Sequence, residues 1–556
     1  MQKTEDLLIE IGCEEIPTGY IYPALDDMKE AFAGFCRDNA IVHGELEICA
    51  TPRRLTLIAR GVAAAQKDSV LEVKGPPARA ARDAHGNWTQ AAEKFAASRG
   101  ASVKDLQVRE TEKGEYVFVV KKQKGRATAR LLPDLLPRVI AGIHFPKSMR
   151  WGTYKMRFAR PIRWVVFLFG KRAMQVPLEG IKSGRYSMGH HFTHNKKIKI
   201  PHVDDYFHLL EEHHVLADHN KRRERIAEAV RSAAPGRPLI SDDLLDDILF
   251  LVEYPHVGVG TFDDQFLKLP REVLLLCIEK TQHYFPVESE TDHDLKPSFC
   301  VVMNMPLEHS EEVIAGYQKV LHSRLKDALF FYLNDMKTPL ADRVPGLERI
   351  VFQKELGSLL EKTNRLQALC AQLCDRLGVN PDDAAATDRA AHLCKADLTT
   401  AMVFEFTELQ GIVGKHYAMR RGEPRQVALA IEEHYAPRFA DDDLPGTTAG
   451  RILAVADKAD TLAGFFSVGL IPTGSEDPFS LRRQGLGLLR ICDNSLLSIP
   501  LQELFSLCLD AYGEAIVPAE RRESVLQQLM EFMDIRFRTL MESRGIPYDV
   551  VNAISL

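Results

Sequence analysis

Two aspartates in the C-terminal half of the chain have residue types suited to metal-assisted chemistry. Asp397 lies in the segment Lys395–Leu398, and Asp457 lies in Val455–Lys458. Carboxylates and imidazoles that converge on a cation lower the pKa of a bound water, which then becomes a nucleophile. Two carboxylates without an imidazole hold a transition metal poorly. The pair therefore allows either a hydrolytic metal site or two aspartates that cap or pair locally, and we expect the second.

Apolar residues around both aspartates recur at intervals of three and four, which is the spacing of one helix face. An all-helical body with a buried Asp on each of two facing helices resembles the HD superfamily of metal-dependent phosphohydrolases. In that comparison Ala396 stands where the His of the His-Asp pair is expected, and neither His392 nor His416 occupies its position. The resemblance implies a degenerate HD-like domain, marked by Ala396, Asp397 and Asp457, without a metal and without catalytic residues.

Seven arginines are candidates for contact with RNA phosphates. They are Arg53, Arg54, Arg150, Arg160, Arg163, Arg482 and Arg483. A planar guanidinium can bind a phosphate at two oxygens and can stack on a base. The formal net charge is −6, yet residues 138–199 contain fourteen Lys and Arg against a single acid, Glu179. This distribution is expected of a protein that meets phosphates on one face, with a solvated basic face as the alternative.

Two tryptophans lie next to these arginines in the sequence. Trp151 and Trp164 could stack on unpaired nucleotides, but a Trp near a strand more commonly belongs to the core, and we favour that interpretation.

The chain carries no convincing motif for ATP. Gly258-Val259-Gly260 is half of a dinucleotide fingerprint, and Gly411–Lys415 has the wrong spacing for a phosphate-binding loop. No run of about 18 apolar residues occurs, and the charged N-terminus is unlike a signal peptide. The ten cysteines form no C-x-x-C pair, which favours reduced thiols. We expect a cytoplasmic protein with no membrane contact and no cofactor of its own.

The period of the apolar residues changes once along the chain. Up to about residue 308, short apolar or alternating runs between turn residues predict strands, with helices between them. From Glu311 onward the apolar residues follow the helical period. We therefore predict an α+β fold with a mixed α/β region of two subdomains at 1–308, an all-helical region at 309–512 and further helices at 513–556.

Six segments together carry a resemblance to a known family. They are Leu8–Pro17, Thr51–Leu55, Met149–Gly152 with Arg160–Trp164, Arg324–Ala328 with Phe330-Phe331, Phe352–Ser358, and Lys395–Arg483. In these segments the chain resembles the β-subunit family of bacterial two-subunit glycyl-tRNA synthetases. Each segment alone is weak, but together they span nearly the whole chain in order, so the resemblance is specific.

The resemblance implies a division of labour between two subunits. In the family an α subunit makes glycyl-adenylate from ATP with Mg, and the β subunit binds tRNA(Gly) and is required for charging, in an α2β2 heterotetramer. It also implies that residues 1–308 are related to the body and tail of archaeal CCA-adding enzymes. Because the chain stops at Leu556, where a C-terminal anticodon-binding domain is expected to begin, we expect a truncated version with impaired or absent anticodon recognition.

Three functions are compared on this basis. We predict a tRNA-binding, non-adenylating subunit of glycine–tRNA ligase, which is an ATP-dependent aminoacyl-tRNA synthetase, and a role in positioning tRNA for glycylation. One alternative is an autonomous HD-type metal-dependent phosphohydrolase, against which Ala396 argues. The other is a scaffold that joins α subunits without touching RNA, and an RNA affinity that falls steeply with salt would exclude it.

Overall fold

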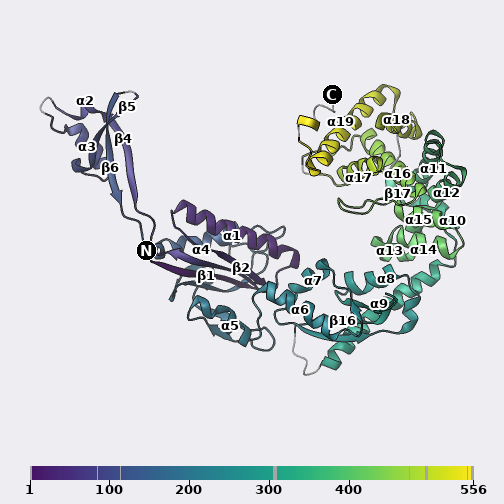
Figure 1. Cartoon of the computed structure of the whole chain (residues 1–556), viewed down its shortest axis with the longest axis horizontal. Coiled ribbons are helices and arrows are strands. Elements are labelled where there is room, and N and C mark those ends of the chain that lie inside the picture. The colour runs from purple at the N-terminus through teal and green to yellow at the C-terminus, as the bar shows by residue number, and fades with distance from the viewer. Residues whose placement is uncertain are drawn as a thin grey trace. The chain divides into compact units, whose positions relative to one another are not determined.

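The computed structural model describes most of the chain as two compact units. The described residues are 3–83, 86–112, 114–304, 310–474, 476–494, 499–547 and 549–551. The first unit comprises Met1–Thr261 and Ile278–Gln318, and the second comprises Phe262–Cys277 and Lys319–Leu556. Figure 1 shows the elements of both units along the chain.

The first unit is built on a five-stranded antiparallel sheet in the order β2-β3-β1-β7-β8. The strands are β1 (Thr4–Cys13), β2 (Leu46–Thr51), β3 (Arg54–Ala63), β7 (Ile162–Phe169) and β8 (Arg172–Ala173). In β1, Leu8 pairs with Ile58 of β3 and Leu168 of β7, so residues of one register position share a face. Because side chains alternate along a strand, the continuous apolar run of β1 supplies two cores, one on each side of the sheet.

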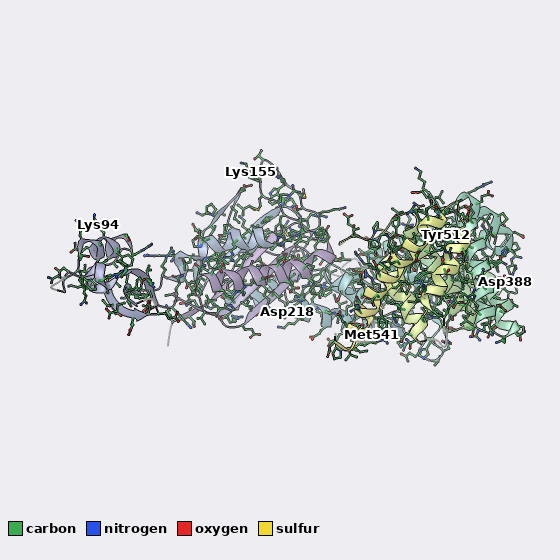
Figure 2. The ribbon with its side chains drawn as sticks, turned by 90° about the horizontal axis from the view of Figure 1, so that it is seen from above. Lys94, Lys155, Asp218, Asp388, Tyr512 and Met541 are labelled. Atoms are coloured by element: carbon green, nitrogen blue, oxygen red, sulfur yellow. The ribbon has the colours of Figure 1, made fainter. Side chains whose placement is uncertain are left out.

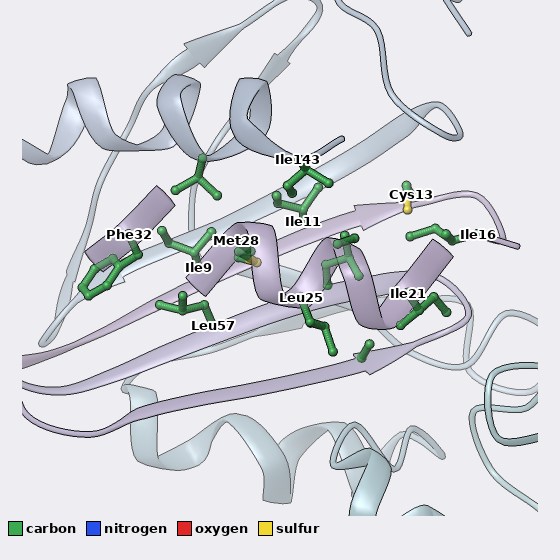
Figure 3. Close-up of a cluster of buried hydrophobic side chains, with 14 of the residues drawn as sticks. Ile9, Ile11, Cys13, Ile16, Ile21, Leu25, Met28, Phe32, Leu57 and Ile143 are labelled. Carbon is green, nitrogen blue, oxygen red and sulfur yellow. The ribbon is translucent and has the colours of Figure 1, made fainter. Parts of the chain in front are cut away.

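Helices cover both faces of this sheet. On one face, α1 (Ile21–Asp38) and α4 (Leu132–Gly142) pack on Ile9 and Ile11 of β1, in the cluster that Figure 3 shows. On the other face, Leu8 packs with residues of η4 (Val203–Asp205) and α5 (Tyr206–Glu212). The burial of complete apolar side chains on two faces stabilises the sheet on which the candidate residues of this unit are carried.

A small α/β module is inserted between β3 and α4. Its sheet has the order β4-β6-β5, and two helices lie with it. These elements are β4 (Ser69–Pro77), α2 (Ala78–Ala81), α3 (Gln90–Ser98), η2 (Val103–Asp105), β5 (Leu106–Thr111) and β6 (Gly114–Gln123). The module has its own apolar cluster, which includes Ala92 and Val119. Ala65 and Ala127, in the segments that lead into and out of the module, form an antiparallel bridge.

A second sheet of the first unit has the order β13-β15-β16-β14. Its strands are β13 (Arg237–Pro238), β14 (His256–Thr261), β15 (Phe285–Glu288) and β16 (Leu295–Met303), and the nearby helices are α6 (His219–Ala233) and α7 (Asp242–Leu249). Helix α6 contacts β14 and β16. Three-residue or shorter strands form two further pairs, β9 (Pro177–Leu178) with β10 (Ile181–Lys182), and β11 (Tyr186–Met188) with β12 (Lys197–Lys199).

The second unit is largely helical and is arranged around one buried helix, α16 (Thr448–Ser467). The other α-helices are α8 (Arg271–Leu275), α9 (Ser310–Asp335, mostly in this unit), α10 (Leu340–Arg343), α11 (Leu359–Arg376), α12 (Pro381–Leu393), α13 (Ala401–Glu405), α14 (Ile412–Arg420), α15 (Arg425–Glu433), α17 (Leu481–Asn494), α18 (Leu501–Tyr512) and α19 (Ala519–Ser543). Helix α16 is buried nearly all round, including its charged residues, and contacts α11, α12, α15, α17, α18 and α19. A short hairpin, β17 (Val351–Gln353) with β18 (Gly357–Ser358), precedes α11.

The predicted order of a mixed α/β region followed by helices is confirmed. The compact units divide the chain at other residues than the predicted regions, because Phe262–Cys277 belongs to the second unit and Ser310–Gln318 to the first. Residues 305–309, around the predicted boundary, lie outside the described residues. In the predicted region 513–556, α19 packs on α16, α17 and α18. No helix in the described ranges is long and apolar enough to cross a membrane.

Candidate functional site

Arg54, a predicted RNA contact, lies inside the first unit. It begins β3, and none of its side chain is exposed. Its guanidinium donates hydrogen bonds to Glu253 and to the carbonyl oxygen of Met188, and its Nε lies 3.8 Å from Oε2 of Glu10. A guanidinium that is fully buried with two carboxylates cannot be reached by a phosphate of an RNA backbone. The structure therefore corrects the prediction for Arg54, whose charge stabilises the fold instead.

Arg53 and Trp164 also lie mostly inside the first unit. Arg53 is 7% exposed, and its guanidinium carbon lies 5.4 Å from the centre of the Trp164 ring. Trp164 is 9% exposed, belongs to an apolar cluster of the sheet and donates from Nε1 to Glu10. A Cβ at Gly12 would lie 1.9 Å from Cε2 of Trp164, so the indole needs glycine beneath it. Trp164 is therefore a core residue, in agreement with the interpretation favoured from the sequence.

The remaining candidates of the first unit are on its surface. Arg150, Arg160 and Arg163 are all exposed. Arg163 donates from Nε to Oε1 of Glu14 at 2.5 Å with 57% of its side chain exposed, and Arg160 donates to the carbonyl oxygen of Ala159 at 3.0 Å. Figure 2 labels Lys155, a further exposed cation of the same segment. These side chains are accessible to a phosphate backbone, in contrast to Arg54.

In the second unit, the three HD-like positions occupy two elements. Ala396 and Asp397 lie in the short 3-10 helix η9 (Ala396–Thr399), and Asp457 lies in α16. All three residues are buried. The two carboxylates have different partners: Oδ2 of Asp397 accepts the backbone N–H of Gly411 at 2.6 Å, whereas Asp457 is bound by lysines. The aspartates therefore do not act on a common ligand in this structure.

Two buried lysines hold Asp457. The Nζ of Lys362 lies 2.9 Å from Oδ1 of Asp457, and the Nζ of Lys395 lies 3.0 Å from Oδ2. Lys395 also lies 2.8 Å from Nε2 of His434, and Lys362 lies 2.9 Å from Oδ2 of Asp460. Burial alone would raise the pKa of Asp457, but the two ammonium groups hold it well below its usual range.

This arrangement does not fit a catalytic metal. Each oxygen of Asp457 already faces an ammonium group at hydrogen-bond distance, and a cation there would be repelled by both lysines. Burial and the adjacent charge of Lys395 hold the pKa of the His434 imidazole well below its usual value. Within the described ranges, no three His, Cys, Asp or Glu side chains gather as a ligand set. The positive charge beside Asp457 is supplied by the chain itself.

Sequence reasoning missed these lysines, although one signal was available. Lys362 lies on the apolar face of α11, three residues after Leu359 and four before Leu366, and a lysine at such a position needs a buried partner. Lys395 directly precedes Ala396 and Asp397, yet the spacing of residues does not reveal that its partner is Asp457. Arg365, one turn after Lys362, completes the cluster by donating from Nε to Asp460 at 2.8 Å.

Asp397 provides a pH-dependent prediction for the second unit. Burial raises its pKa from 3.8 to about 6, although the N–H of Gly411 opposes the shift. A raised pKa means that the folded state binds this proton more tightly than the unfolded chain, so stability decreases as pH rises from about 4 to about 6. This loss in the free energy of unfolding is on the order of 2–3 kcal/mol, and we expect it to be absent from the Asp397→Asn variant. Urea unfolding at several pH values would measure it.

The matched control for Asp397 is the exposed Asp382. The Asp382→Asn variant keeps the buried carboxylate of Asp397, so it should still lose stability as the pH rises from about 4 to about 6. Identical slopes between pH 4 and pH 6 for the Asp397→Asn variant and the unmodified chain would contradict the assignment.

The last two candidates, Arg482 and Arg483, lie in the first turn of α17. Arg482 is half-buried and donates from Nη2 to the carbonyl oxygen of Gly474 at 2.6 Å, whereas Arg483 is exposed. Both line a cavity of about 440 Å³ between α17 and α19, and Arg483 also lines an adjoining cavity of about 460 Å³. The seven predicted arginines thus form no single cluster: two lie in the core of the first unit, three lie on its surface, and two line cavities of the second unit.

Comparison with known proteins gives one consistent result. The family model described as glycyl-tRNA synthetase beta subunit matches residues 7–555. A glycine–tRNA ligase beta subunit of Clostridioides difficile (strain 630) is 42% identical over 551 residues, which cover 99% of this chain and 79% of the relative. Similar proteins of the same name from Desulforamulus reducens and Moorella thermoacetica are 41% and 42% identical, again over 99% of this chain and 79% of each relative.

Proposed function

The chain belongs to the glycyl-tRNA synthetase β-subunit family, and from this premise we propose that it binds tRNA(Gly) and positions it for glycylation by a partner α subunit. The family match along almost the whole chain carries the proposal. As a β subunit, the chain is a component of glycine–tRNA ligase. We infer that adenylation, with its ATP and Mg, takes place on the α subunit, that the two kinds of subunit form an α2β2 assembly, and that the protein works in the cytoplasm.

The surface of the first unit supports a role in RNA binding. Arg150, Arg160 and Arg163 are exposed in a segment that has many cations and few acids. Exposed guanidinium groups bind phosphates without reading sequence, which suits the placement of a large RNA. Holding the tRNA end near a reactive adenylate contributes by orientation, because it turns a bimolecular encounter into a local one.

The charge cluster at Asp457 argues against the phosphohydrolase alternative. Such a reaction needs a cation that activates water, whereas the carboxylate of Asp457 is paired with Lys362 and Lys395. We propose that the second unit is an HD-like body that has exchanged metal ligands for internal ion pairs, and that residues 1–308 are related to the body and tail of archaeal CCA-adding enzymes.

A charging assay tests the proposed function. We expect no glycyl-tRNA from this chain alone, and at least about tenfold more from this chain with the α subunit than from the α subunit alone, because orientation by the β subunit contributes to the rate. Acid-gel separation of charged and uncharged tRNA would measure both. Charging by this chain alone would refute the division of labour.

Filter binding of tRNA across a salt series distinguishes RNA binding from a scaffold role. Several phosphate contacts should make log K fall linearly with log salt, with a slope of about −3 or steeper. A complex with the α subunit that forms while this chain shows no RNA affinity at low salt would support the scaffold instead.

A further inference from the structure

Two adjoining cavities lie beside α17 in the second unit. Most of their lining comes from α17, α19 and the loop at residues 435–440. Pro437 and Arg483 line both cavities. Their volumes, about 440 and 460 Å³, are in the range of pockets that hold small organic ligands. Gly487 lines the first of them, and a Cβ at this position would lie 3.3 Å from Pro437, which lines both cavities.

The lining of these cavities is strongly positive. It includes Arg438, Arg482, Arg483, Arg490 and Arg536. None of the five forms an ion pair with a carboxylate in the described part of the chain, and the cavities are lined by one acid, Glu408. Five guanidinium groups without carboxylate partners repel one another, so an anion that enters gains attraction from several of them.

Backbone carbonyls orient these guanidinium groups without neutralising them. Arg490 donates to the carbonyl oxygens of Phe439 at 3.3 Å and Asp442 at 2.9 Å, and Arg438 donates to that of Gln410 at 3.4 Å. Arg536 lies over the ring of Phe532 at 4.5 Å. Burial and the nearby charge of Arg482 lower the pKa of Arg536, although the carboxylate of Asp477 opposes the shift. Four of the five guanidinium groups are therefore held by carbonyl oxygens or by an aromatic ring and not by a carboxylate ion pair, a preorganised arrangement for an anion.

An apolar wall accompanies the charge. Phe439 is 58% exposed, and Pro437 and Leu486 lie in the same lining. An aromatic ring that is exposed beside unpaired arginines offers a stacking surface next to phosphate-binding groups. Inorganic phosphate would use the arginines alone, whereas a nucleotide would use both features.

We propose that these cavities bind one unpaired nucleotide of an RNA strand, with its phosphate on Arg483 and Arg536 and its base against Phe439. The inference deepens the proposed function and rests on it, since it takes the ligand to be RNA. Each guanidinium contributes a charge-assisted hydrogen bond to the phosphate, and the ring of Phe439 accepts any base face, so binding is selective for unpaired nucleotides and tolerant of sequence.

Three variants test the site. Arg483→Gln with Arg536→Gln should weaken binding of a fluorescein-labelled single-stranded RNA pentamer at least about tenfold and, because the two side chains share one phosphate, reduce the steepness of the salt dependence by about 0.7. Phe439→Ala should weaken binding about five- to tenfold at an unchanged salt slope, because it removes stacking and no charge. Arg425→Gln, an exposed arginine of the same unit that is outside the cavities, is the matched control and should change neither quantity. Fluorescence anisotropy gives both readouts, and thermal melting verifies that each variant folds.

The outcomes separate this inference from the proposed function. If the full chain binds tRNA with a steep salt dependence while the arginine double variant and Phe439→Ala bind the pentamer as well as the control does, the cavity assignment is wrong and the proposed function stands. If the full chain binds neither tRNA nor the pentamer, the proposed function is wrong, and the cavity assignment that rests on it is wrong too. Competition by AMP at concentrations equal to those of the pentamer would identify a site for a free mononucleotide and overturn the RNA assignment. Competition by inorganic phosphate alone at such concentrations would exclude a role for the base.

Discussion

Replacing Arg54 by methionine is expected to lower the free energy of unfolding of the first unit by about 3–5 kcal/mol. The substitution leaves Glu10 and Glu253 buried without their cation, and methionine fills most of the volume without neutralising either carboxylate. Glu10 retains hydrogen bonds from Ser187 and from Tyr206 at 2.6 Å. The decrease in the free energy of unfolding therefore comes mainly from buried carboxylate charges that are left without a cation. The three tryptophans all lie in this unit, so intrinsic fluorescence during urea unfolding reports on it selectively.

Arg163→Met is the matched control for Arg54→Met. Its ion pair with Glu14 is largely exposed, and such pairs contribute about 0–1 kcal/mol. Arg163→Met should therefore leave stability nearly unchanged and weaken RNA binding. An Arg54→Met variant that is as stable as the unmodified chain but binds RNA poorly would restore Arg54 to the set of RNA contacts.

Replacing Asp457 by alanine is expected to lower the free energy of unfolding of the second unit by about 3–5 kcal/mol. Lys362 and Lys395 would each lose a buried partner, although Asp460 still faces Lys362. Since the pKa of Asp457 is held below its ordinary 3.8, its contribution is present above pH 4 and is lost as pH falls further. The difference in the free energy of unfolding between the unmodified chain and the Asp457→Ala variant should therefore decrease only below pH 4. Hydrogen exchange of α16 amides would measure it.

Glu405→Ala provides the comparison for Asp457→Ala. Glu405 pairs with Arg324 at 3.5 Å on the surface of the same unit, so its removal should change stability by less than about 1 kcal/mol. A similarly small change for Asp457→Ala between pH 6 and pH 8 would show that the lysines relax into water and that the buried cluster does not stabilise the unit.

Local features of the fold could be predicted from sequence, whereas the partners of buried charges could not. The apolar period of α11 and the glycine that follows it predict where that helix ends, and Gly378 indeed has a φ of +61° just after Arg376. The apolar run of β7 likewise predicts a buried strand. Arg54, however, meets Glu253 across 199 positions of sequence, and Lys395 meets Asp457 across 62. No local pattern encodes such pairs, so the sequence alone gives no indication that Arg54 has a buried partner.

The inserted α/β module affects how the first sheet can assemble. Strands β1 and β7 pair in register although more than a hundred residues separate them, which would ordinarily make closure slow. The backbone N–H of Gln66 donates to the carbonyl oxygen of Arg126, next to the Ala65–Ala127 bridge, so the entry and exit of the module lie together. Once the module has collapsed on its own apolar cluster, the segment that must close is shorter in effective length than the full connection between β1 and β7. Because its two ends lie together, the module is an insertion whose length can change without changing the register of the strands on either side.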